Sequence, residues 1–588
     1  MPCHENGGSC RPDLYVGVDF GTTFTGVSYM TPGDAAATII RTWPGKKGAK
    51  VPSVLAKDTT GNNIKWGFLC HDLDESSKWR FLKLCLDCDP SRLADTPWAP
   101  ADSSEAYKLV EVYLRQIYLY LSGHLVEKLM EDRTNGVGSW NKSWAHMRVE
   151  FTFSVPGTWS PLAVHRFARA ARRAGFGQEI DHQMGLGLTE SVAAVVATSE
   201  LNIPFANGDA VLSIDAGGGT TDLAFVTLQS MKPMMMEPVL PVTAIGVGSV
   251  LIDMGFKNDL ETRLAAKGVP LDTARKCAAK ISQGEEFQRW KCNHGQENTA
   301  PDKSMAGTIF NSEALDNQGV PADYNLIFEK KLLDGLFDCQ IKEIKAHVIA
   351  ALGEFEKARG KRLKHIVLSG GLGSSDYVFQ KLDEFFTWQK GRRPCLGEAK
   401  LWTCSNPQTA VIRGLLMNKR NETFGPRITR ASYGVVAHQC PLGKSKSRLK
   451  GSRDSRGKAV PGQIQWVVKK GTMIRPNDRF RHKVTRTFTK SDPDDWTETI
   501  VSSTCSLEYL PQTTQDAGVE VLCQVQVPKG APTGMKKGTW PFAGRYQTYE
   551  CELQIVVGDS GECTVDVISS RGVELSKGST TINVSHNP

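Results

Sequence analysis

One short pattern occurs twice in this chain and restricts the folds that the chain can adopt. VDFGTTFTGVSY begins at Val18, and the related IDAGGGTTDLAFV begins at Ile214. Each copy is an apolar run that carries an aspartate (Asp19 or Asp215) into a glycine-led turn rich in threonine, and then returns as a second apolar run. Apolar runs on both sides of a short Gly-Thr turn are typical of a β-hairpin. The repeat predicts two equivalent hairpins, each with one aspartate at the end of a strand.

The residue types in these turns suit a polyphosphate. Glycine has no Cβ, so backbone N–H groups can approach anionic oxygens, and threonine hydroxyls add further donors. An aspartate would repel a phosphate unless a cation lay between them, and Mg²⁺ that keeps most of its waters is the expected ion. One such turn could be a plain tight turn, but two copies in the same order favour a phosphate site. The candidate phosphate-binding residues are Gly21, Thr22, Thr23, Gly217, Gly218, Gly219, Thr220 and Thr221, and the candidate metal residues, acting through water, are Asp19 and Asp215.

A third glycine element follows the strand-like run KHIVLSG. Gly370 and Gly371 precede a segment that is predicted to become helical near Ser374 or Ser375. A glycine pair at the end of a strand permits a flat ligand, such as adenine or ribose, to approach the backbone closely. Taken alone, this is a common strand-to-helix connection. Its position after two phosphate-type hairpins predicts that it completes a nucleotide site.

The pattern of elements changes along the chain. Residues 1–12 show no periodicity and are predicted to form a disordered tail. Between residues 13 and 427, strand-like runs (EFTFSV, AVLSIDA, HIVLSG) alternate with helical ones such as PLAVHRFARAARRAG, which predicts an α/β nucleotide-binding domain with parallel strands. Residues 428–588 contain strand-like runs broken by Gly, Pro and Asp, which predicts a β-rich domain. The basic stretch KSKSRLKGSRDSRGK, from Lys444, is interpreted as a surface loop, with a polyanion-binding or localisation patch as the alternative.

Composition argues against several other classes of protein. With 588 residues the chain is too long for one hydrophobic core, and its 40% hydrophobic and 23% charged residues are ordinary for a globular protein. No run approaches the roughly 20 apolar residues of a membrane span, and the first residues lack the apolar core of a signal peptide. We therefore expect a cytoplasmic protein, with the nucleus as the alternative location. The net charge of +8 is small for this length, so no nucleic acid is expected as a partner.

The 15 cysteines show no disulfide framework, and we expect reduced thiols. Cys85 and Cys88 have the spacing of a metal site, but no second pair follows at a suitable distance. Since a structural zinc needs four ligands, none is expected here.

The three glycine elements, in this order, resemble the phosphate-1, phosphate-2 and adenosine motifs of the actin, hexokinase and 70-kDa heat-shock protein superfamily. The heat-shock branch is the most similar. VDFGTTFT resembles its first motif, SVPGTWSPLAVHRFARAARRAGF its strand, proline and helix before the lobe connection, and GLTESVAAVVA its connecting helix. The resemblance covers residues 13–425 and implies an actin-like, two-lobed fold with a duplicated ribonuclease H-like unit. It also implies ATP or ADP and Mg²⁺ as cofactors.

The resemblance further implies roles for individual residues. The strand-terminal aspartates would position hydrated magnesium and the attacking water, while Thr22 and Thr220 would contact phosphate oxygens. Lys83, in WRFLKLCLD, would neutralise charge on the transferred phosphoryl group, and a solvated surface lysine is the alternative. Glu190, in TESVAA, would complete the set, and a first-turn glutamate that favours the helix dipole is the alternative. The implied catalytic residues are Asp19, Lys83, Glu190, Asp215 and Thr220.

The sequence departs from the heat-shock pattern around the base. Ser191 stands where the family has a proline after the connecting glutamate, and Ser374 stands where an arginine stacks on adenine. The glutamate and lysine that hold the nucleoside in the family are matched only by Gln288 and Lys291. These departures predict weaker or differently arranged contacts to the base.

Further matches lie near the second hairpin. Gly246 and Gly248, in AIGVGSV, resemble a turn that faces the nucleotide, although Gly-X-Gly alone is a common pattern. Asp222, in GGGTTDLAF, fits the family pattern but could serve only to brace the hairpin. The remaining candidate cofactor-binding residues are therefore Gly246, Gly248, Lys291, Gly370 and Gly371.

The carboxyl-terminal region also resembles the heat-shock proteins. YECELQIVVGDSGECTVDVISSRG, from Tyr549, is similar to the last strands of their β-sandwich peptide-binding subdomain, and a generic hairpin is the alternative. The sequence after it is too short for the family's helical lid, so the resemblance implies a divergent, lidless relative. The implied function is slow ATP hydrolysis by a chaperone-like protein, in which lobe closure is transmitted to a β domain that holds an unfolded peptide or client protein.

Two other functions fit the same residues. A sugar or small-metabolite kinase can share this fold. Such a kinase needs a general base for the acceptor hydroxyl, and no aspartate in a substrate loop is identified for that role. A nucleotide-binding scaffold without turnover would agree with the altered adenosine motif.

Overall fold

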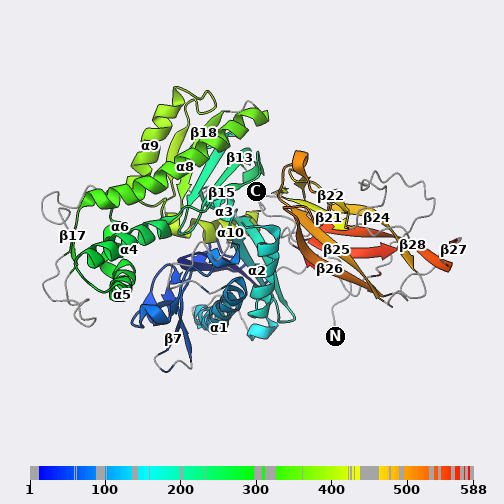
Figure 1. Cartoon of the computed structure of the whole chain (residues 1–588), viewed down its shortest axis with the longest axis horizontal. Coiled ribbons are helices and arrows are strands. Elements are labelled where there is room, and N and C mark those ends of the chain that lie inside the picture. The colour runs from blue at the N-terminus through cyan, green and yellow to red at the C-terminus, as the bar shows by residue number, and fades with distance from the viewer. Residues whose placement is uncertain are drawn as a thin grey trace. The chain divides into compact units, whose positions relative to one another are not determined.

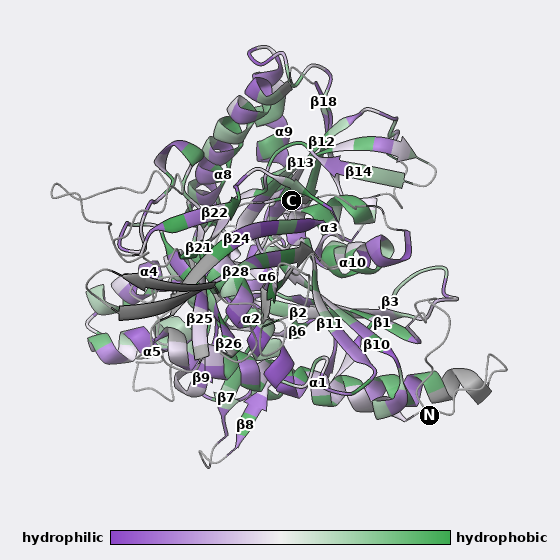
Figure 2. Cartoon of the chain, turned by 90° about the vertical axis from the view of Figure 1, so that its right-hand side faces the viewer, coloured by the Kyte–Doolittle hydropathy of each residue, from purple (hydrophilic) through white to green (hydrophobic). Residues whose placement is uncertain are grey.

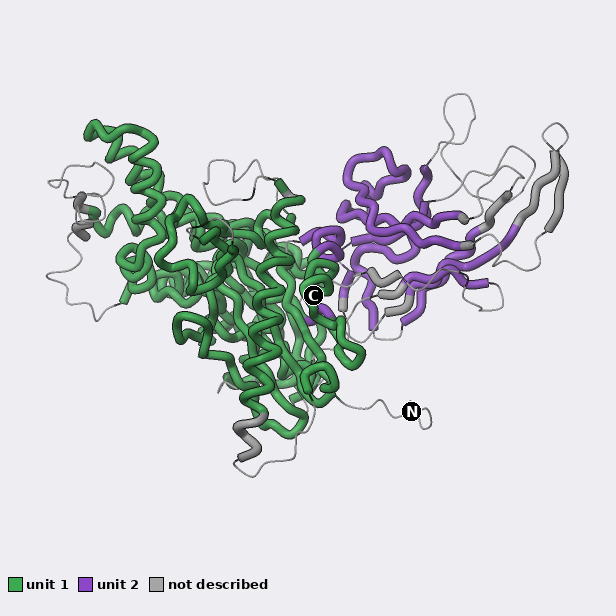
Figure 3. The backbone as a smooth tube through the Cα atoms, turned by 90° about the horizontal axis from the view of Figure 1, so that it is seen from below, with its two compact units in different colours: residues 1–158, 167–184, 188–424 green, residues 159–166, 185–187, 425–588 purple. Residues whose placement is uncertain are grey.

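The fold is known from a computed structural model, which divides into two compact units (Figure 3). The first unit comprises residues 1–158, 167–184 and 188–424, and the second comprises residues 159–166, 185–187 and 425–588. The expected tail up to residue 11, Cys88 of the cysteine pair, the basic stretch from Lys444 and the GDSG part (558–561) of the run from Tyr549 lie outside the described residues. The structure describes residues 12–58, 60, 63–87, 100, 102–134, 143–157, 159–198, 203–231, 234–296, 308–310, 326–359, 362–404, 406–421, 423, 427–429, 431–436, 462–475, 478–488, 495–528, 536–540, 544–557, 563–569, 575 and 580–582.

The first sheet of the first unit contains the first predicted hairpin. Its strand order is β11-β10-β1-β2-β3, and β6 also pairs with β2. Strand β1 is antiparallel to β2 and parallel to β10, and this register places Asp19 opposite Gly26. The strands are β1 (Leu14–Phe20), β2 (Phe24–Met30), β3 (Thr38–Ile39), β6 (Val51–Pro52), β10 (Val149–Val155) and β11 (His182–Thr189).

The second sheet of this unit contains the second predicted hairpin. Its order is β14-β13-β12-β18-β19, with β15 also paired to β13. Strand β12 is antiparallel to β13 and parallel to β18, as β1 is antiparallel to β2 and parallel to β10. The two hairpins therefore have the same place in their sheets. The strands are β12 (Ala210–Ala216), β13 (Thr221–Met231), β14 (Met234–Pro238), β15 (Thr243–Ile245), β18 (Leu363–Ser369) and β19 (Lys400–Thr403).

Helices cover both sheets (Figure 1). Buried residues of α1 recur every four positions at Tyr113, Ile117, Leu121 and Leu125, and hydrophilic and hydrophobic residues alternate along this helix (Figure 2). Helices α4, α8 and α9 pack on the second sheet in one large hydrophobic core. The helices are α1 (Ser103–Thr134), α2 (Pro161–Arg173), α3 (Glu190–Ala197), α4 (Ser249–Ala266), α5 (Leu271–Ser282), α6 (Glu285–Cys292), α8 (Lys330–Arg359), α9 (Asp376–Lys390) and α10 (Ala410–Asn421).

Helices α10 and α3 each accept a hydrogen bond from a serine of a different sheet. Ser28 in β2 donates a hydrogen bond to the backbone oxygen of Ile412 in α10 (2.8 Å), and Ser213 in β12 donates one to that of Ser191 in α3 (2.8 Å). The two helices also touch each other, because a Cβ on Gly414 would collide with the backbone oxygen of Ala193. Short strands complete the unit: β4 (Thr42–Trp43), β5 (Lys46–Lys47), β7 (Leu55–Lys57), β8 (Ile64–Trp66), β9 (Lys78–Trp79), β16 (Thr308–Phe310) and β17 (Leu326–Phe328).

From Arg427 onward, the described part of the second unit consists mainly of strands. One sheet has the order β22-β21-β25-β26, and another has β24-β28-β29-β30 with β27 paired to β28. Its core includes Tyr433, Ile500, Leu553 and Val567. In the described part of the chain, no helix is long and apolar enough to cross a membrane. The strands are β20 (Arg427–Ile428), β21 (Ser432–Val436), β22 (Ile464–Val468), β23 (Met473–Ile474), β24 (Arg479–Phe488), β25 (Asp495–Ser503), β26 (Glu520–Pro528), β27 (Lys536–Trp540), β28 (Gly544–Val557), β29 (Cys563–Ser569) and β30 (Thr580–Ile582).

Candidate functional site

The turns of the two hairpins lie against each other within the first unit. A Cβ on Gly218 would lie 2.9 Å from Oγ1 of Thr23, and one on Gly219 would lie 2.6 Å from Oγ1 of Thr22. Real Cβ atoms do not approach other atoms so closely, so only glycine allows this contact. The fold therefore brings together two turns that are far apart in the sequence.

The third glycine element lies against the end of β12. The backbone N–H groups of Leu372 and Gly373 both donate to the carbonyl oxygen of Ala216, at 2.9 and 3.0 Å. Gly370 has a φ of +87°, and a Cβ on it would lie 2.7 Å from Oδ1 of Asp215. Both the backbone conformation and the close approach require glycine at position 370. The helix that follows is α9, which is preceded by Ser375 as its N-cap residue.

The N-terminus of α4 is joined to the second turn. The N–H groups of Ser249 and Val250 donate to the carbonyl oxygens of Gly217 and Gly218, at 3.2 and 2.9 Å. Gly248 is tightly packed, since a Cβ there would collide with the backbone oxygen of Gly218. This junction fixes the direction in which the second turn presents its backbone.

The two strand-terminal aspartates are buried but have different partners. Asp19 accepts hydrogen bonds from Nζ of Lys50 (2.7 Å) and from Oγ of Ser154 (2.8 Å). Asp215 accepts one from Oγ of Ser369 (2.8 Å). Sequence reasoning missed Lys50, Ser154 and Ser369, because none of them belongs to a glycine-led turn.

These partners give the aspartates opposite pKa shifts. Burial alone would raise the pKa of Asp19, but Lys50 and Lys83 outweigh it and lower the pKa below its usual value. Burial raises the pKa of Asp215 to about 6, and the charges of Asp222 and Asp19 add to the effect. The positive charge around Asp215 is therefore too small to offset the effect of burial on its carboxylate.

Lys83 and Glu190 form a buried ion pair in the same place. Lys83 is only 4% exposed, so the alternative of a solvated surface lysine is wrong. Burial raises the pKa of Glu190 to about 8, with further contributions from Asp19 and Asp222. Burial would lower the pKa of Lys83, but Glu190 and Asp19 outweigh it and raise that pKa. The raised pKa of Lys83 keeps its ammonium group protonated beside Glu190. Glu190 is also the first residue of α3, so the two interpretations of this glutamate are compatible.

A cavity of about 1960 Å³ joins these groups within the first unit. It exceeds the roughly 300–1,000 Å³ of ordinary small-molecule pockets, so a nucleoside triphosphate has ample room. Gly371 lies at its wall with open space where a Cβ would be. Candidate residues from the sequence that line the cavity are Asp19, Gly21, Thr22, Thr23, Lys83, Glu190, Asp215, Gly217, Gly218, Gly219, Thr220, Lys291, Gly370 and Gly371.

Four residues near the second hairpin are not at the cavity wall. The hydroxyl of Thr221 donates to the backbone oxygen of Val247 (2.8 Å). Gly246 is exposed and Gly248 packs behind Gly218. Asp222 accepts a hydrogen bond from the backbone N–H of Gly157, so it braces the hairpin against the loop after β10. Thr221, Asp222 and Gly248 therefore brace the second hairpin, whereas Gly246 makes no such contact.

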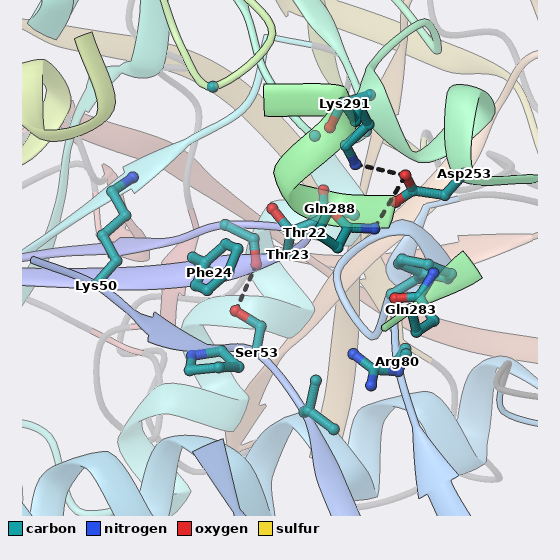
Figure 4. Close-up of a pocket in the computed structure, with 18 of the residues that line it drawn as sticks. Thr22, Thr23, Phe24, Lys50, Ser53, Arg80, Asp253, Gln283, Gln288 and Lys291 are labelled. Atoms are coloured by element: carbon teal, nitrogen blue, oxygen red, sulfur yellow. Dashed lines mark hydrogen bonds and ion pairs between the residues drawn. The ribbon is translucent and has the colours of Figure 1, made fainter. Parts of the chain in front are cut away.

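A second group of side chains lines another part of the cavity (Figure 4). Lys291 forms an ion pair with Asp253, and Nε2 of Gln288 donates to the same carboxylate at 3.3 Å. Ser374 donates its hydroxyl to the backbone oxygen of Gly371 (2.7 Å). Sequence reasoning missed the α5 residues on this wall, which are Arg275, Lys276, Ala279 and Lys280.

These residues fit a hydrated divalent cation bound together with a polyphosphate. Among the described residues, no group of three or more His, Cys, Asp and Glu side chains could hold a metal ion by itself. Mg²⁺ is usually bound by one or two carboxylates together with waters and phosphate oxygens. The strand-terminal pair Asp19 and Asp215 at one cavity supplies such a donor set, and the under-compensated Asp215 favours a cation there.

The raised pKa of Asp215 predicts that Asp215→Asn stabilises the nucleotide-free protein. The folded-state pKa of about 6 lies above the ordinary 3.8, so folding takes up a proton between these values and stability falls as pH rises through them. Since asparagine keeps the hydrogen bond from Ser369 without the charge, we expect about 2–3 kcal/mol more unfolding free energy at pH 8. Denaturant unfolding should show the full gain at pH 8, about half of it at pH 5 and about a fifth of it at pH 4. A gain that is equal at all three pH values would contradict the assignment.

Comparison with known proteins adds two partial similarities. A family model described as a domain of unknown function (DUF8568) matches residues 427–533. The human protein Heat shock 70 kDa protein 12A is 25% identical to this chain over 197 residues. That match covers 31% of this chain and 28% of the human protein, so the chain spans well under two thirds of that relative. The similarity is therefore to part of one protein that is named as a heat-shock protein.

Proposed function

We propose that the first unit binds ATP with Mg²⁺ and hydrolyses it slowly, as a divergent relative of the 70-kDa heat-shock proteins with an actin-like, duplicated two-lobed fold. One observation carries the proposal: two Gly-Thr turns from equivalent places in two sheets face each other at one cavity, each with a buried strand-terminal aspartate. The partial similarity to Heat shock 70 kDa protein 12A supports the same function. The proposal includes a nucleotide-binding domain at residues 13–427 and a β-rich domain at residues 428–588.

In this proposal the chain's own residues bind and orient the phosphates. The backbone N–H groups and hydroxyls of the two turns hold the phosphate oxygens, and bound Mg²⁺ supplies additional positive charge. Lys83 is held by Glu190 so that its ammonium stabilises charge on the transferred phosphoryl group. Asp215, with a pKa of about 6, accepts a hydrogen bond from the attacking water and orients it.

ATP binding is tested by filling the cavity at Gly371. No atom of the chain lies within 4 Å of a Cβ at position 371, so the folded chain has room for a larger side chain there. In Gly371→Phe the phenyl ring would occupy space in the cavity that the ligand needs. We expect at least about 10-fold weaker ATP binding by calorimetry, equivalent to about 1.4 kcal/mol. The matched control is Gly391→Phe, at an equally open glycine that is outside the cavity. Equal affinities for the parent and both variants would contradict the site.

We further propose that the nucleotide state is transmitted to the second unit and that this unit binds an unfolded peptide or client protein. Such coupling requires a peptide to bind with different affinity in the ATP and ADP states. Fluorescence anisotropy of a labelled unfolded peptide, measured with ATP and with ADP, tests both parts. Peptide affinity that is identical in the two states would contradict transmission.

A scaffold without turnover is the second candidate, and one observation favours it. Asp19 and Glu190 are already paired with Lys50 and Lys83, so two carboxylates of the site are compensated without a cofactor. A single-turnover assay with radiolabelled ATP separates the two functions. Tight ATP binding without release of phosphate would establish the scaffold.

A further inference from the structure

Lys50 is held at the cavity by a segment that is fastened to the first hairpin. It directly precedes β6, whose Val51 pairs with Thr25 of β2. Just after β6, the backbone N–H of Ser53 donates to the oxygen of Thr23 (2.9 Å), and its hydroxyl donates to the oxygen of Gly21 (2.8 Å). These bonds hold β6 along the phosphate-type turn, so the backbone of the adjacent Lys50 is held in place.

The stem of Lys50 passes over Gly26. A Cβ on Gly26 would lie 3.1 Å from Cε and 3.3 Å from Cγ of Lys50, so a side chain at position 26 would crowd this path. Gly26 is directly opposite Asp19 in the β1–β2 register. Figure 4 shows the extended stem of Lys50. Its Nζ lies 2.7 Å from Oδ2 of Asp19. The side chains of Lys50 and Asp19 are only 18% and 6% exposed.

The two equivalent aspartates, Asp19 and Asp215, differ in whether a lysine is paired with them. Both oxygens of Asp19 are occupied, one by Lys50 and the other by Ser154. Among the residues that the structure describes, Asp215 has a hydroxyl partner, Ser369, but no ion pair. A hydrated cation can therefore approach Asp215 directly, whereas at Asp19 it meets the positive charge of an ammonium group.

We propose that Lys50 couples metal binding to nucleotide binding by acting as a removable counter-ion of Asp19. Without nucleotide, displacing Lys50 from Asp19 costs free energy and weakens the binding of a divalent cation. When a nucleotide is present, its phosphates provide a new anionic partner for the released ammonium, since lysine binds phosphate as a point charge. Metal and nucleotide therefore strengthen each other's binding by the same factor. This inference rests on the proposed nucleotide function and names a residue that no glycine motif contains.

The direct test is metal binding without nucleotide. Lys50→Met keeps the length of the apolar stem but removes the charge, so we expect at least about 10-fold tighter binding of Mn²⁺ by electron paramagnetic resonance of the full chain. The matched control, Lys46→Met, removes a lysine that lines the same cavity but pairs with Glu285 at 3.5 Å, and its Mn²⁺ affinity should stay near that of the parent. Unchanged affinity in Lys50→Met, or an equal gain in Lys46→Met, would overturn the proposal.

The double variant Lys50→Met/Asp19→Asn locates the gained metal site. It should lose the extra affinity, whereas retention of that affinity would place the metal elsewhere and overturn the proposal. If the methionine variant does not fold, Lys50→Gln removes the same charge while keeping a hydrogen-bond donor, and the same result is expected.

The coupling itself is measured with ADP. The ratio of ADP affinities with and without Mn²⁺ should be several-fold smaller in Lys50→Met than in the parent, because the counter-ion no longer has to move. An unchanged ratio would overturn the coupling role. Failure of the parent to bind any nucleotide would instead contradict the proposed function, and the nucleotide-free Mn²⁺ comparison would still test the displacement of Lys50.

Discussion

Asp215→Asn should lower the single-turnover rate of ATP hydrolysis at least about 100-fold while ATP affinity changes less than about 10-fold. The reason is that asparagine keeps the hydrogen bond from Ser369 and the shape of the site, but cannot accept a proton or hold the attacking water as a carboxylate does. Radiolabelled ATP with excess protein measures the chemical step, and equilibrium calorimetry measures the affinity.

Asp209→Asn is the matched control for this variant. Asp209 precedes the same strand at its opposite end, pairs with His365 at 3.2 Å, and does not line the cavity. Its hydrolysis rate should remain close to that of the parent. If Asp215→Asn hydrolyses ATP at the parental rate, Asp215 has no part in the reaction. If both variants lose turnover equally, the loss reflects damage to β12 and not chemistry at its end.

Lys83→Met should also reduce hydrolysis by at least about 100-fold, because phosphoryl transfer depends on positive charge positioned at the transferred group. Methionine fills nearly the same volume as the lysine stem, so the change removes mainly the ammonium. The single-turnover assay is again the measurement. Lys419→Met serves as the control, since Lys419 forms a partly buried ion pair with Glu150 in the same unit but outside the cavity.

Loss of stability could imitate the effect of Lys83→Met, and a second variant separates the two explanations. Removing one partner of a buried ion pair commonly costs about 3–5 kcal/mol, whereas replacing both costs much less. The double variant Lys83→Met/Glu190→Gln should therefore melt near the parent and still fail to hydrolyse ATP. A double variant that regains turnover would show that Lys83 acts on stability alone.

Much of the first unit's local structure could be predicted from the sequence, because its hairpins combine a period-two apolar pattern with glycine at the turn. The runs around Asp19 and Asp215 are strand pairs, and the segment after Gly371 becomes α9 at Asp376. The sequence could not show that Gly218 and Gly219 rest on Thr23 and Thr22, because that contact depends on how the two sheets pack.

The parts of the site that sequence reasoning missed lie outside motifs. Lys50 precedes a two-residue strand, and nothing in GAKVPS indicates that its ammonium reaches Asp19. Ser154 and Ser369 look like ordinary strand residues, and only the parallel pairing of β10 and β18 with the hairpins brings them to the aspartates. The opposite pKa shifts of Asp19 and Asp215 follow from these partners, so a repeat that looks symmetric in sequence is electrostatically asymmetric.

The contact between Gly414 of α10 and the backbone oxygen of Ala193 in α3 joins two helices that are hydrogen-bonded to different sheets. Each helix is tied to its own sheet by a serine, and no side chain of Gly414 separates the helices at this point. Glycine at position 414 therefore lets α10 lie directly against the backbone of α3, and both helices contribute to one buried cluster with strands of the second sheet. A bulkier residue at position 414 would collide with the backbone of Ala193 and force the two helices apart at this point.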